Sequence, residues 1–294
     1  MKDTLESLRH KIDRAVELGT VVRSMKAMSA SSIHQYEQAV RSLEDYYRAV
    51  AWGFCVCLPQ LKERIVPAGS RKGKTGAIVF GAGQGLVGQF NDLIVRFAQS
   101  RLRAIPGEKI VWAVGEIIVP RLEDAGLPPV KTFAVPHSVY AITPLIGKVL
   151  FEVEQALEAG AVSEVYLFFH RPREGGVYAP ECQRFIPLDE QWLQQYLETE
   201  WPSRQVPETV FHAGRTLQSL IREYFFATLF RACADSLASE NASRLAAMQR
   251  AEKNIQELLD DLNLSYHQLR QNTIDEELFD VIAGSEALGE ESGG

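Results

Sequence analysis

The chain has 294 residues, of which 46% are apolar and 23% are charged, and its formal net charge is −7. These proportions are ordinary for a soluble globular protein and exclude a collagen, a wholly disordered chain and a polytopic membrane protein. An acidic chain lacks the broad basic face that a phosphate backbone needs, so we expect no nucleic-acid partner.

The sequence also bears on where the protein resides. The chain is charged from Lys2 onward, without the apolar core of a signal peptide, so we expect no export. Its most apolar stretch, residues 49–58, is shorter than the roughly 20 residues of a membrane helix, so we expect no membrane span. The cysteines lack zinc-ligand spacing and are predicted to be reduced, mostly buried thiols in a cytosolic setting. They are Cys55, Cys57, Cys182 and Cys233.

Glycine and proline divide the chain into three parts. Residues 1–58 contain no proline, residues 59–207 hold every proline, and neither residue type occurs between Gly214 and Gly284. Because proline breaks helices and glycine weakens them, both ends are predicted to be long helices and the middle a mixed domain. The predicted parts are a helix over 1–58, a Rossmann-like α/β domain over 74–205, a helix over 208–288 and a flexible tail over 289–294.

A heptad repeat runs through the N-terminal helix. With Leu5 at position a, positions a and d are mostly apolar, apart from a small or polar stretch between Gly19 and Ser29. A repeat sustained over this length predicts a coiled coil. The a series is Leu5, Ile12, Gly19, Lys26, Ile33, Val40, Tyr47 and Phe54, and the d series is Leu8, Ala15, Val22, Ser29, Tyr36, Leu43, Val50 and Cys57.

The C-terminal helix carries a similar repeat. Its a series is Met248, Ile255, Leu262 and Leu269, its d series is Ala251, Leu258 and Ser265, and Asn241 and Arg244 interrupt the seam upstream. A helix this long cannot bury its apolar stripe against a compact domain alone. We therefore predict that the two ends pair as an antiparallel coiled coil, with a bundle of separate amphipathic helices as the alternative.

The middle of the chain alternates between strand and helix patterns. Strands are predicted over 77–80, 109–114, 164–169 and 177–185, and helices over 117–123 and 143–159, with a further helical pattern between Phe90 and Leu102. Such alternation predicts an open, largely parallel sheet.

A glycine motif follows the first predicted strand. Residues Gly83-Gln84-Gly85-Leu86-Val87-Gly88 match G-x-G-x-x-G between a strand and a helix, the context of a dinucleotide-binding turn. The acid that holds the ribose is expected about 20 residues further on, whereas Glu116 lies well beyond that spacing. We therefore expect a tight strand-to-helix turn and no cofactor.

No other motif supports catalysis. Gly73-Lys74-Thr75 resembles the end of a phosphate-binding loop, but it precedes its strand and Ala68 stands where glycine is required, so we expect a solvated basic linker. No histidine shows ligand spacing, and no serine or cysteine lies in the context of a nucleophile. The sequence thus predicts no active site and no metal site.

Three stretches resemble the gamma subunit of F-type ATP synthases, the central rotor shaft. Residues 21–31 match a lysine/arginine-x-Met-Lys pattern followed by small residues. Residues 239–248, continued by 270–278, match the last helix of that family, and residues 85–91 are similar to its Gly-Leu-Cys-Gly-Gly-Leu-Asn loop. The resemblance covers essentially the whole chain and accounts for the glycine motif without a nucleotide.

The sequence departs from the family pattern at several positions. Ser32 stands where the family usually has lysine, Asp275 where it has threonine, and Val87 where it has cysteine. These differences suggest a divergent branch, such as the alternate F-type ATPases, and leave the standard branch open.

The resemblance implies a non-catalytic shaft. The paired helices would stand inside a hexamer of alpha and beta subunits, and the middle domain would contact the epsilon subunit and the membrane c-ring, at the cytoplasmic face of the cell membrane. It implies no cofactor. The residues that match contacts with the surrounding subunits are Met25, Lys26, Arg244, Arg270, Gln271 and Glu277.

Two other functions stay open at this point. One is a structural coiled-coil tether without a motor role, and the other is a nucleotide-dependent oxidoreductase that uses residues 83–88. A run of small residues in the first helix favours the shaft, because a protruding side chain would meet the surrounding subunits in every rotary state. These residues are Ser24, Ala27, Ser29, Ala30, Ser31 and Ser32.

Overall fold

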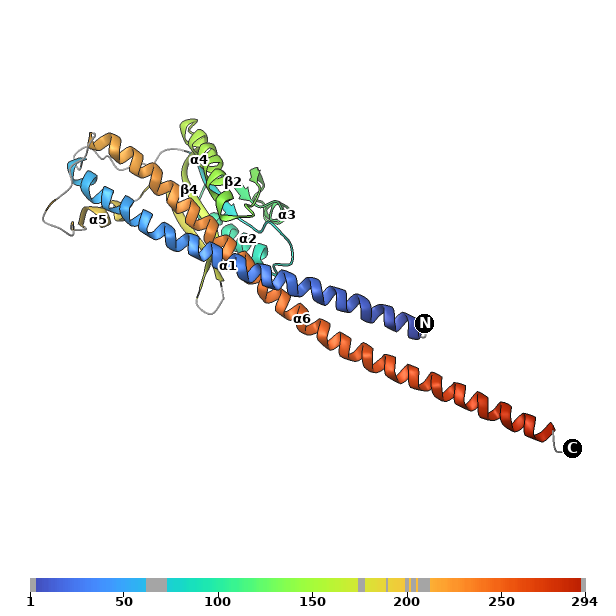
Figure 1. The fold of residues 1–294 in the computed structure, drawn as a ribbon. Coiled ribbons are helices and arrows are strands. Elements are labelled where there is room, and N and C mark those ends of the chain that lie inside the picture. The colour runs from blue at the N-terminus through green and yellow to red at the C-terminus, as the bar shows by residue number, and fades with distance from the viewer. Residues whose placement is uncertain are drawn as a thin grey trace. The chain divides into compact units, whose positions relative to one another are not determined.

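The structure, a computed structural model, describes residues 4–61, 73–173, 178–188, 190–198, 201, 205 and 212–291. Two long helices, α1 (Leu5–Leu61) and α6 (Ala213–Glu291), are the first and last elements of the chain, and the remaining elements lie between them in the sequence (Figure 1). The chain forms two compact units: a helical unit of Met1–Met28 with Leu245–Gly294, and a sheet unit of Ser29–Arg244. The predicted border between the sheet domain and the last helix falls in residues 206–211, outside the described residues.

Within the helical unit, α1 and α6 run in opposite directions. Val22 of α1 is buried in one cluster with Met248 and Ile255 of α6. A Cβ atom added at Gly19 would lie 3.5 Å from Ile255 Cγ2, and Lys26 Nζ lies 2.5 Å from Glu252 Oε2. Residue numbers therefore rise along α1 as they fall along α6, which confirms the antiparallel pairing.

The heptad predicted for α1 is confirmed by burial. Every member of the d series is buried except Leu43, which is half-buried. The interruption at Ser29 is also real, because this serine is only 2% exposed and occupies a seam position that a large side chain would ordinarily fill.

The heptad predicted for α6 is wrong at Leu258. Met248 and Ile255 are buried as expected, but Leu258 is 49% exposed, and Leu259 contacts the buried cluster instead. A straight α-helix has about 3.6 residues per turn, so a strict seven-residue frame drifts by roughly 20° per heptad. The buried line therefore moves by one residue within two turns.

The described residues of the sheet unit form five strands. They are β1 (Lys74–Phe80), β2 (Lys109–Val114), β3 (Pro129–Phe133), β4 (Val162–Pro172) and β5 (Tyr178–Ile186). Their order is β3-β2-β1-β4-β5. All neighbours are parallel except β4 and β5, so the largely parallel sheet is confirmed. The sequence prediction missed β3.

Helices cover both faces of this sheet. They are α2 (Phe90–Arg103), α3 (Val119–Asp124) and α4 (Ile142–Glu158), with a 3₁₀ turn, η1 (Val139–Ala141), before α4. Ile78 and Phe80 of β1 are buried with residues of α4 and α6, whereas Ala77 and Val79 are buried with residues of α2 and α3. The alternation of strand side chains thus gives the sheet two cores.

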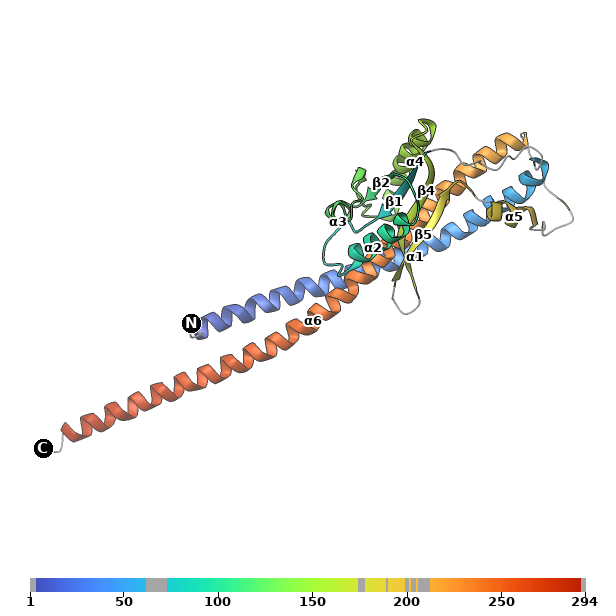
Figure 2. The ribbon, with the colours of Figure 1, turned by 180° about the vertical axis from the view of Figure 1, so that it is seen from behind.

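A further aromatic cluster lies where α1 and α6 meet α5 (Glu190–Glu198), a helix that the sequence prediction also missed (Figure 2). Phe54 of α1 is fully buried there, with its ring centroid 4.8 Å from that of Trp192 and 5.9 Å from that of Tyr224. Across the described ranges, the helices lack an apolar stretch sufficient to cross a membrane.

Candidate functional site

The glycine loop, residues 83–88, follows β1 at the point where the strand order reverses. The strands β2 and β3 lie on one side of β1, and β4 lies on the other. In open α/β sheets, ligands bind beside the carboxyl ends of the strands at such a point. Here α6 supplies side chains that contact the loop.

Three hydrogen bonds join α6 to the backbone of the glycine loop. The Gly83 amide donates to Glu240 Oε2 at 3.3 Å, Arg244 Nη2 donates to the Gln84 carbonyl at 3.4 Å, and the Ser243 hydroxyl donates to the Val87 carbonyl at 2.6 Å. A carboxylate of the chain itself thus binds the amide of the first glycine of the motif. The glycine motif is a contact for α6.

Glu240 and Arg244 form an ion pair one helical turn apart. Arg244 Nη2 lies 2.5 Å from Glu240 Oε1, and the two side chains are only 7% and 5% exposed. Arg244 Nη1 also donates to Asn241 Oδ1 at 3.1 Å. Buried charges are tolerated when they are paired and hydrogen-bonded, as both are here.

Tyr36 of α1 lies near this pair and is 5% exposed. Burial raises the pKa of Tyr36, the carboxylate of Glu240 raises it further, and the guanidinium of Arg244 lowers it. The ion pair is therefore enclosed by α1, α6 and the glycine loop.

The loop conformation is tight. A Cβ atom at Gly83 would lie 2.7 Å from Val135 Cβ, so only glycine fits there. Gly88 has a φ of 55°, and Leu86 adopts a φ of 60°, a left-handed conformation that is unfavourable for leucine. The Leu86 side chain is 62% exposed.

Two polar side chains fix the segment on either side of the loop. Asn91 Oδ1 accepts a hydrogen bond from the Ala82 amide at 2.9 Å, and His170 Nε2 lies 2.9 Å from the Phe90 carbonyl. Burial lowers the pKa of His170 to about 4, although the bond to Phe90 opposes this shift. His170 is thus a neutral donor in the core.

The other motif that suggested a phosphate loop begins a strand. Lys74 and Thr75 are the first residues of β1. Lys74 forms an ion pair with Glu108, and Thr75 Oγ1 donates to Glu164 Oε1 at 2.9 Å. The expectation of a linker is therefore wrong for these two residues, because both pair with β4 and Thr75 also pairs with β2, although Lys74 is solvated as expected.

The remaining chemistry is sparse. All four cysteines are thiols; Cys57 and Cys233 are buried, whereas Cys55 and Cys182 are half-buried. Within the described ranges, no three His, Cys, Asp or Glu side chains converge to hold a metal ion.

Met25 and Lys26, two of the predicted contact residues, lie beside the seam of the helical unit. Met25 is half-buried against the cluster around Val22 and Met248. The Lys26 ammonium pairs with Glu252, and the two side chains are 36% and 35% exposed. Both predicted residues therefore contact α6 and also reach the surface.

The other predicted contact residues differ in burial. Arg270, Gln271 and Glu277 are exposed on α6. The C-terminal part of this helix runs past the start of α1 (Figures 1 and 2). Arg244 is only 6% exposed, and it binds the glycine loop.

Sequence reasoning missed an exposed apolar stripe at this end of α6. Its members are spaced by four, three and one residues, the pattern of one helical face. The seven-residue frame through Leu269 does not contain all of them, so a separate count from Ile274 would have revealed the stripe. It comprises Ile274, Leu278, Val281 and Ile282, which are 51%, 55%, 69% and 46% exposed.

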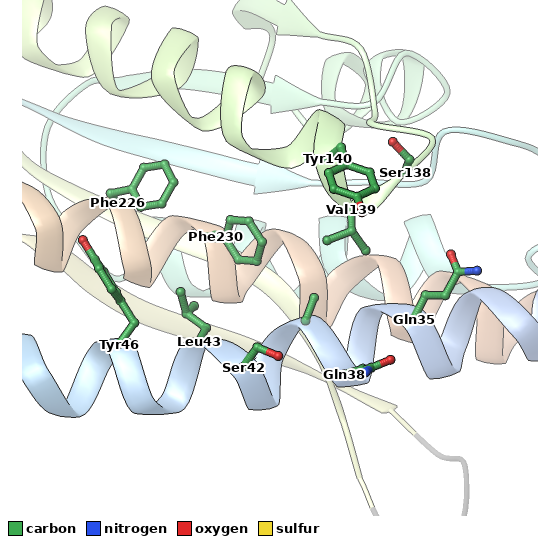
Figure 3. A pocket seen from close by; sticks show the side chains of 11 residues that line it. Gln35, Gln38, Ser42, Leu43, Tyr46, Ser138, Val139, Tyr140, Phe226 and Phe230 are labelled. Carbon is green, nitrogen blue, oxygen red and sulfur yellow. The ribbon is translucent and has the colours of Figure 1, made fainter.

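A second candidate surface lies in the sheet unit. An apolar groove of about 800 Å³ opens between α1, α6 and η1. Figure 3 shows Phe230 of α6, Leu43 of α1 and Tyr140 of η1 around the same space. Tyr140 is 92% exposed. Exposed aromatic side chains beside an apolar groove are typical of protein–protein contacts.

Comparisons with known proteins agree on one family. The ATP synthase family pattern matches residues 4–288. The "ATP synthase gamma chain" of Polynucleobacter asymbioticus is 23% identical and aligns over 96% of this chain and 99% of its own length. The corresponding protein of Leptothrix cholodnii is 24% identical over 97% and 99% of the two chains.

Solved structures show a similar fold. A chain in the rotor of the Euglena gracilis mitochondrial ATP synthase superposes with a TM-score of 0.61 at 13% identity, over 92% of this chain and 98% of that one. A chain in the central stalk and c-ring structure of the Tetrahymena thermophila mitochondrial ATP synthase gives a TM-score of 0.56 at 17% identity, over 79% and 99% of the two chains.

Proposed function

The chain belongs to the family of ATP synthase gamma chains, and from this premise we propose how its surfaces serve the central stalk. It is the non-catalytic rotor subunit of the complex. We propose that it carries torque between a membrane c-ring and a catalytic hexamer of alpha and beta subunits, at the cytoplasmic face of the cell membrane.

The exposed end of α6 carries this proposal. Large apolar side chains are ordinarily buried. The four apolar side chains of the stripe, on the part of α6 that extends past α1, are about half exposed or more. An exposed apolar stripe of this kind marks a surface that is covered in an assembly. We propose that the alpha and beta subunits bury this apolar stripe. Arg270, Gln271 and Glu277 would form polar contacts with them on the same part of α6.

Lys26 and Met25 are proposed as contacts from α1. The Lys26 ammonium pairs with Glu252 while part of its side chain reaches solvent, so it can exchange partners between rotary states without leaving a buried charge unpaired. Arg244 is far less exposed than Lys26. We therefore propose that Arg244 binds the glycine loop and does not contact the alpha and beta subunits.

Cysteine cross-linking tests the collar contact directly. Glu277→Cys would be combined with single cysteines in the facing loops of the beta subunit. We expect a disulfide that stops ATP turnover and is reversed by reductant, because a rotor must break this contact in every cycle. Turnover that continues with the disulfide formed would indicate a tether. Lys253→Cys, an exposed site on the same helix, is the matched control for nonspecific cross-linking.

The apolar groove is proposed as the contact for the epsilon subunit. Its aromatic lining supplies large apolar side chains at the surface of the sheet unit. The variants Phe230→Ser and Tyr140→Ser should lower the amount of epsilon subunit that co-purifies with the chain. Retention of epsilon at the wild-type ratio would exclude this assignment.

Reconstitution tests the function itself. Complexes with and without the chain would be placed in vesicles, and ATP hydrolysis and ATP-driven ion uptake would be measured together. We expect uptake only with the chain present. The same assay in proton and sodium gradients tests the coupling ion, and the assignment to a divergent branch stays a prediction.

A further inference from the structure

We propose that Glu240 and Arg244 are positioning residues that transmit torque from α6 to the five-stranded sheet through the glycine loop. The inference rests on the proposed function. It follows from one juxtaposition. Neighbouring side chains of α6 bind backbone groups along the loop, at Gly83, Gln84 and Val87.

Stability of the fold alone does not account for the Glu240–Arg244 ion pair. A buried ion pair is expensive to desolvate, and apolar residues of similar volume often stabilise a protein equally well or better. Apolar side chains, however, cannot bind the backbone of another element. Both charges of this pair do so, since Glu240 accepts from the Gly83 amide and Arg244 donates to the Gln84 carbonyl.

The surroundings keep water away from the ion pair. The two side chains are 5% and 7% exposed, and Tyr36 lies near them from α1. Charge-assisted hydrogen bonds are stronger where water is excluded, and added salt screens them little.

The loop is well placed to receive a force. It directly continues β1, the central strand, which is paired with both β2 and β4. The Gln84 and Val87 carbonyls, on either side of the left-handed Leu86, are both held by α6. A rotation of α6 therefore moves the loop and the centre of the sheet together.

Another charged link, between α6 and α4, is much weaker. Arg222 Nη2 lies 3.2 Å from Glu154 Oε2 of α4, but these side chains are 71% and 42% exposed. Exposed ion pairs contribute little, because water and salt screen them. This pair supplies a matched control.

The experiment compares two double variants in the complete complex reconstituted in vesicles. Glu240→Met with Arg244→Met removes the bonds to Gly83 and Gln84, leaves the Ser243–Val87 bond in place and keeps similar volume, whereas Arg222→Gln with Glu154→Gln removes the exposed pair. We expect the methionine variant to hydrolyse ATP with loss of ion uptake, and the glutamine variant to keep the wild-type ratio of uptake to hydrolysis. In the free chain, exchange of the Gly83 amide should become faster in the methionine variant only.

A third variant keeps the test decisive if the methionine pair does not fold. Arg244→Lys keeps the charge opposite Glu240, but an ammonium lacks the planar fork that reaches Glu240, Asn241 and Gln84 together. We expect a folded chain with a lowered ratio of uptake to hydrolysis. A wild-type ratio in every folded variant would overturn the inference, whereas absence of uptake in the wild-type complex would instead refute the proposed function.

Discussion

The Ser243 hydroxyl of α6 lies 2.6 Å from the Val87 carbonyl of the glycine loop. The Tyr178 hydroxyl of β5 lies 2.9 Å from the same serine oxygen. One small side chain therefore joins the long helix, the loop and the antiparallel edge strand. A larger residue at this position would separate all three.

We predict that Ser243→Ala lowers the free energy of unfolding by about 1–3 kcal/mol, because it leaves buried polar groups without a partner. Ser265→Ala is the matched control on α6, since the Ser265 hydroxyl bonds only its own helix at an exposed position. Its effect should stay within about 0.5 kcal/mol. Urea unfolding of the free chain measures both, and equal effects would refute the role given to Ser243.

Asp235 and His170 are expected to give opposite pH dependences. Burial raises the pKa of Asp235 from 3.8 to about 6. The positive charges of Arg231 and Arg171 lower this pKa, and the negative charge of Glu181 raises it. Its folded state binds more protons than its unfolded state, so its contribution to stability is lost as pH rises from about 4 to about 6. Burial lowers the pKa of His170 from 6.5 to about 4, so its contribution is lost as pH falls through that range.

Each shift corresponds to about 3 kcal/mol, because one pKa unit is about 1.4 kcal/mol, and the two contributions therefore offset one another in the wild type. Relative to wild type, Asp235→Asn should lose stability on acidification from pH 6.5 to pH 4, and His170→Gln should gain it. Urea unfolding across this range measures both differences. Parallel curves for wild type and either variant would contradict the assigned pKa shift.

Leu86 is predicted to tolerate glycine better than valine. Its φ of 60° is unfavourable by about 1–2 kcal/mol for a side-chain-bearing residue. Leu86→Gly should therefore leave the free energy of unfolding within about 1 kcal/mol of wild type, since relief of strain offsets the added freedom of the unfolded chain. Leu86→Val should destabilise, because a β-branched residue resists this conformation. The reverse order would show that the loop relaxes in solution.

Phe54 is predicted to be essential for the cluster that joins α1, α5 and α6. It is fully buried and contacts the rings of Trp192, Tyr196 and Tyr224. Phe54→Ala should lower the free energy of unfolding by about 3–5 kcal/mol. Phe151→Ala on α4, where the ring is 58% exposed, should change it much less. Thermal unfolding compares them, and similar losses would contradict the packing described.

The long helices and the parallel strands could be predicted because their patterns are local. The d series of α1 and the apolar run of residues 109–114 each contain the period of their element. β3 was missed because it has only five residues, begins at Pro129 and buries only Phe133. α5 was missed because its apolar face is defined by Phe54 and Tyr224, which are distant in the sequence.

The candidate site shows the same limit. The resemblance of residues 239–248 to the family's last helix implies a contact of Arg244 with a surrounding subunit, whereas its hydrogen bond to Gln84 of the glycine loop cannot be read from a sequence pattern. The loop and the helix are separated by more than 150 residues, since the Gly83–Glu240 bond spans 157 positions. Only the fold shows that the two motifs contact each other.

Direct observation of rotation tests the central claim. An alpha and beta hexamer would be fixed to a surface with this chain inside, and a probe would be attached through Phe151→Cys, with the native cysteines replaced by alanine. We predict that the probe turns in one direction while ATP is hydrolysed and stops when ATP is removed. ATP hydrolysis by the same complexes with a stationary probe would contradict the assignment of this chain as the rotor.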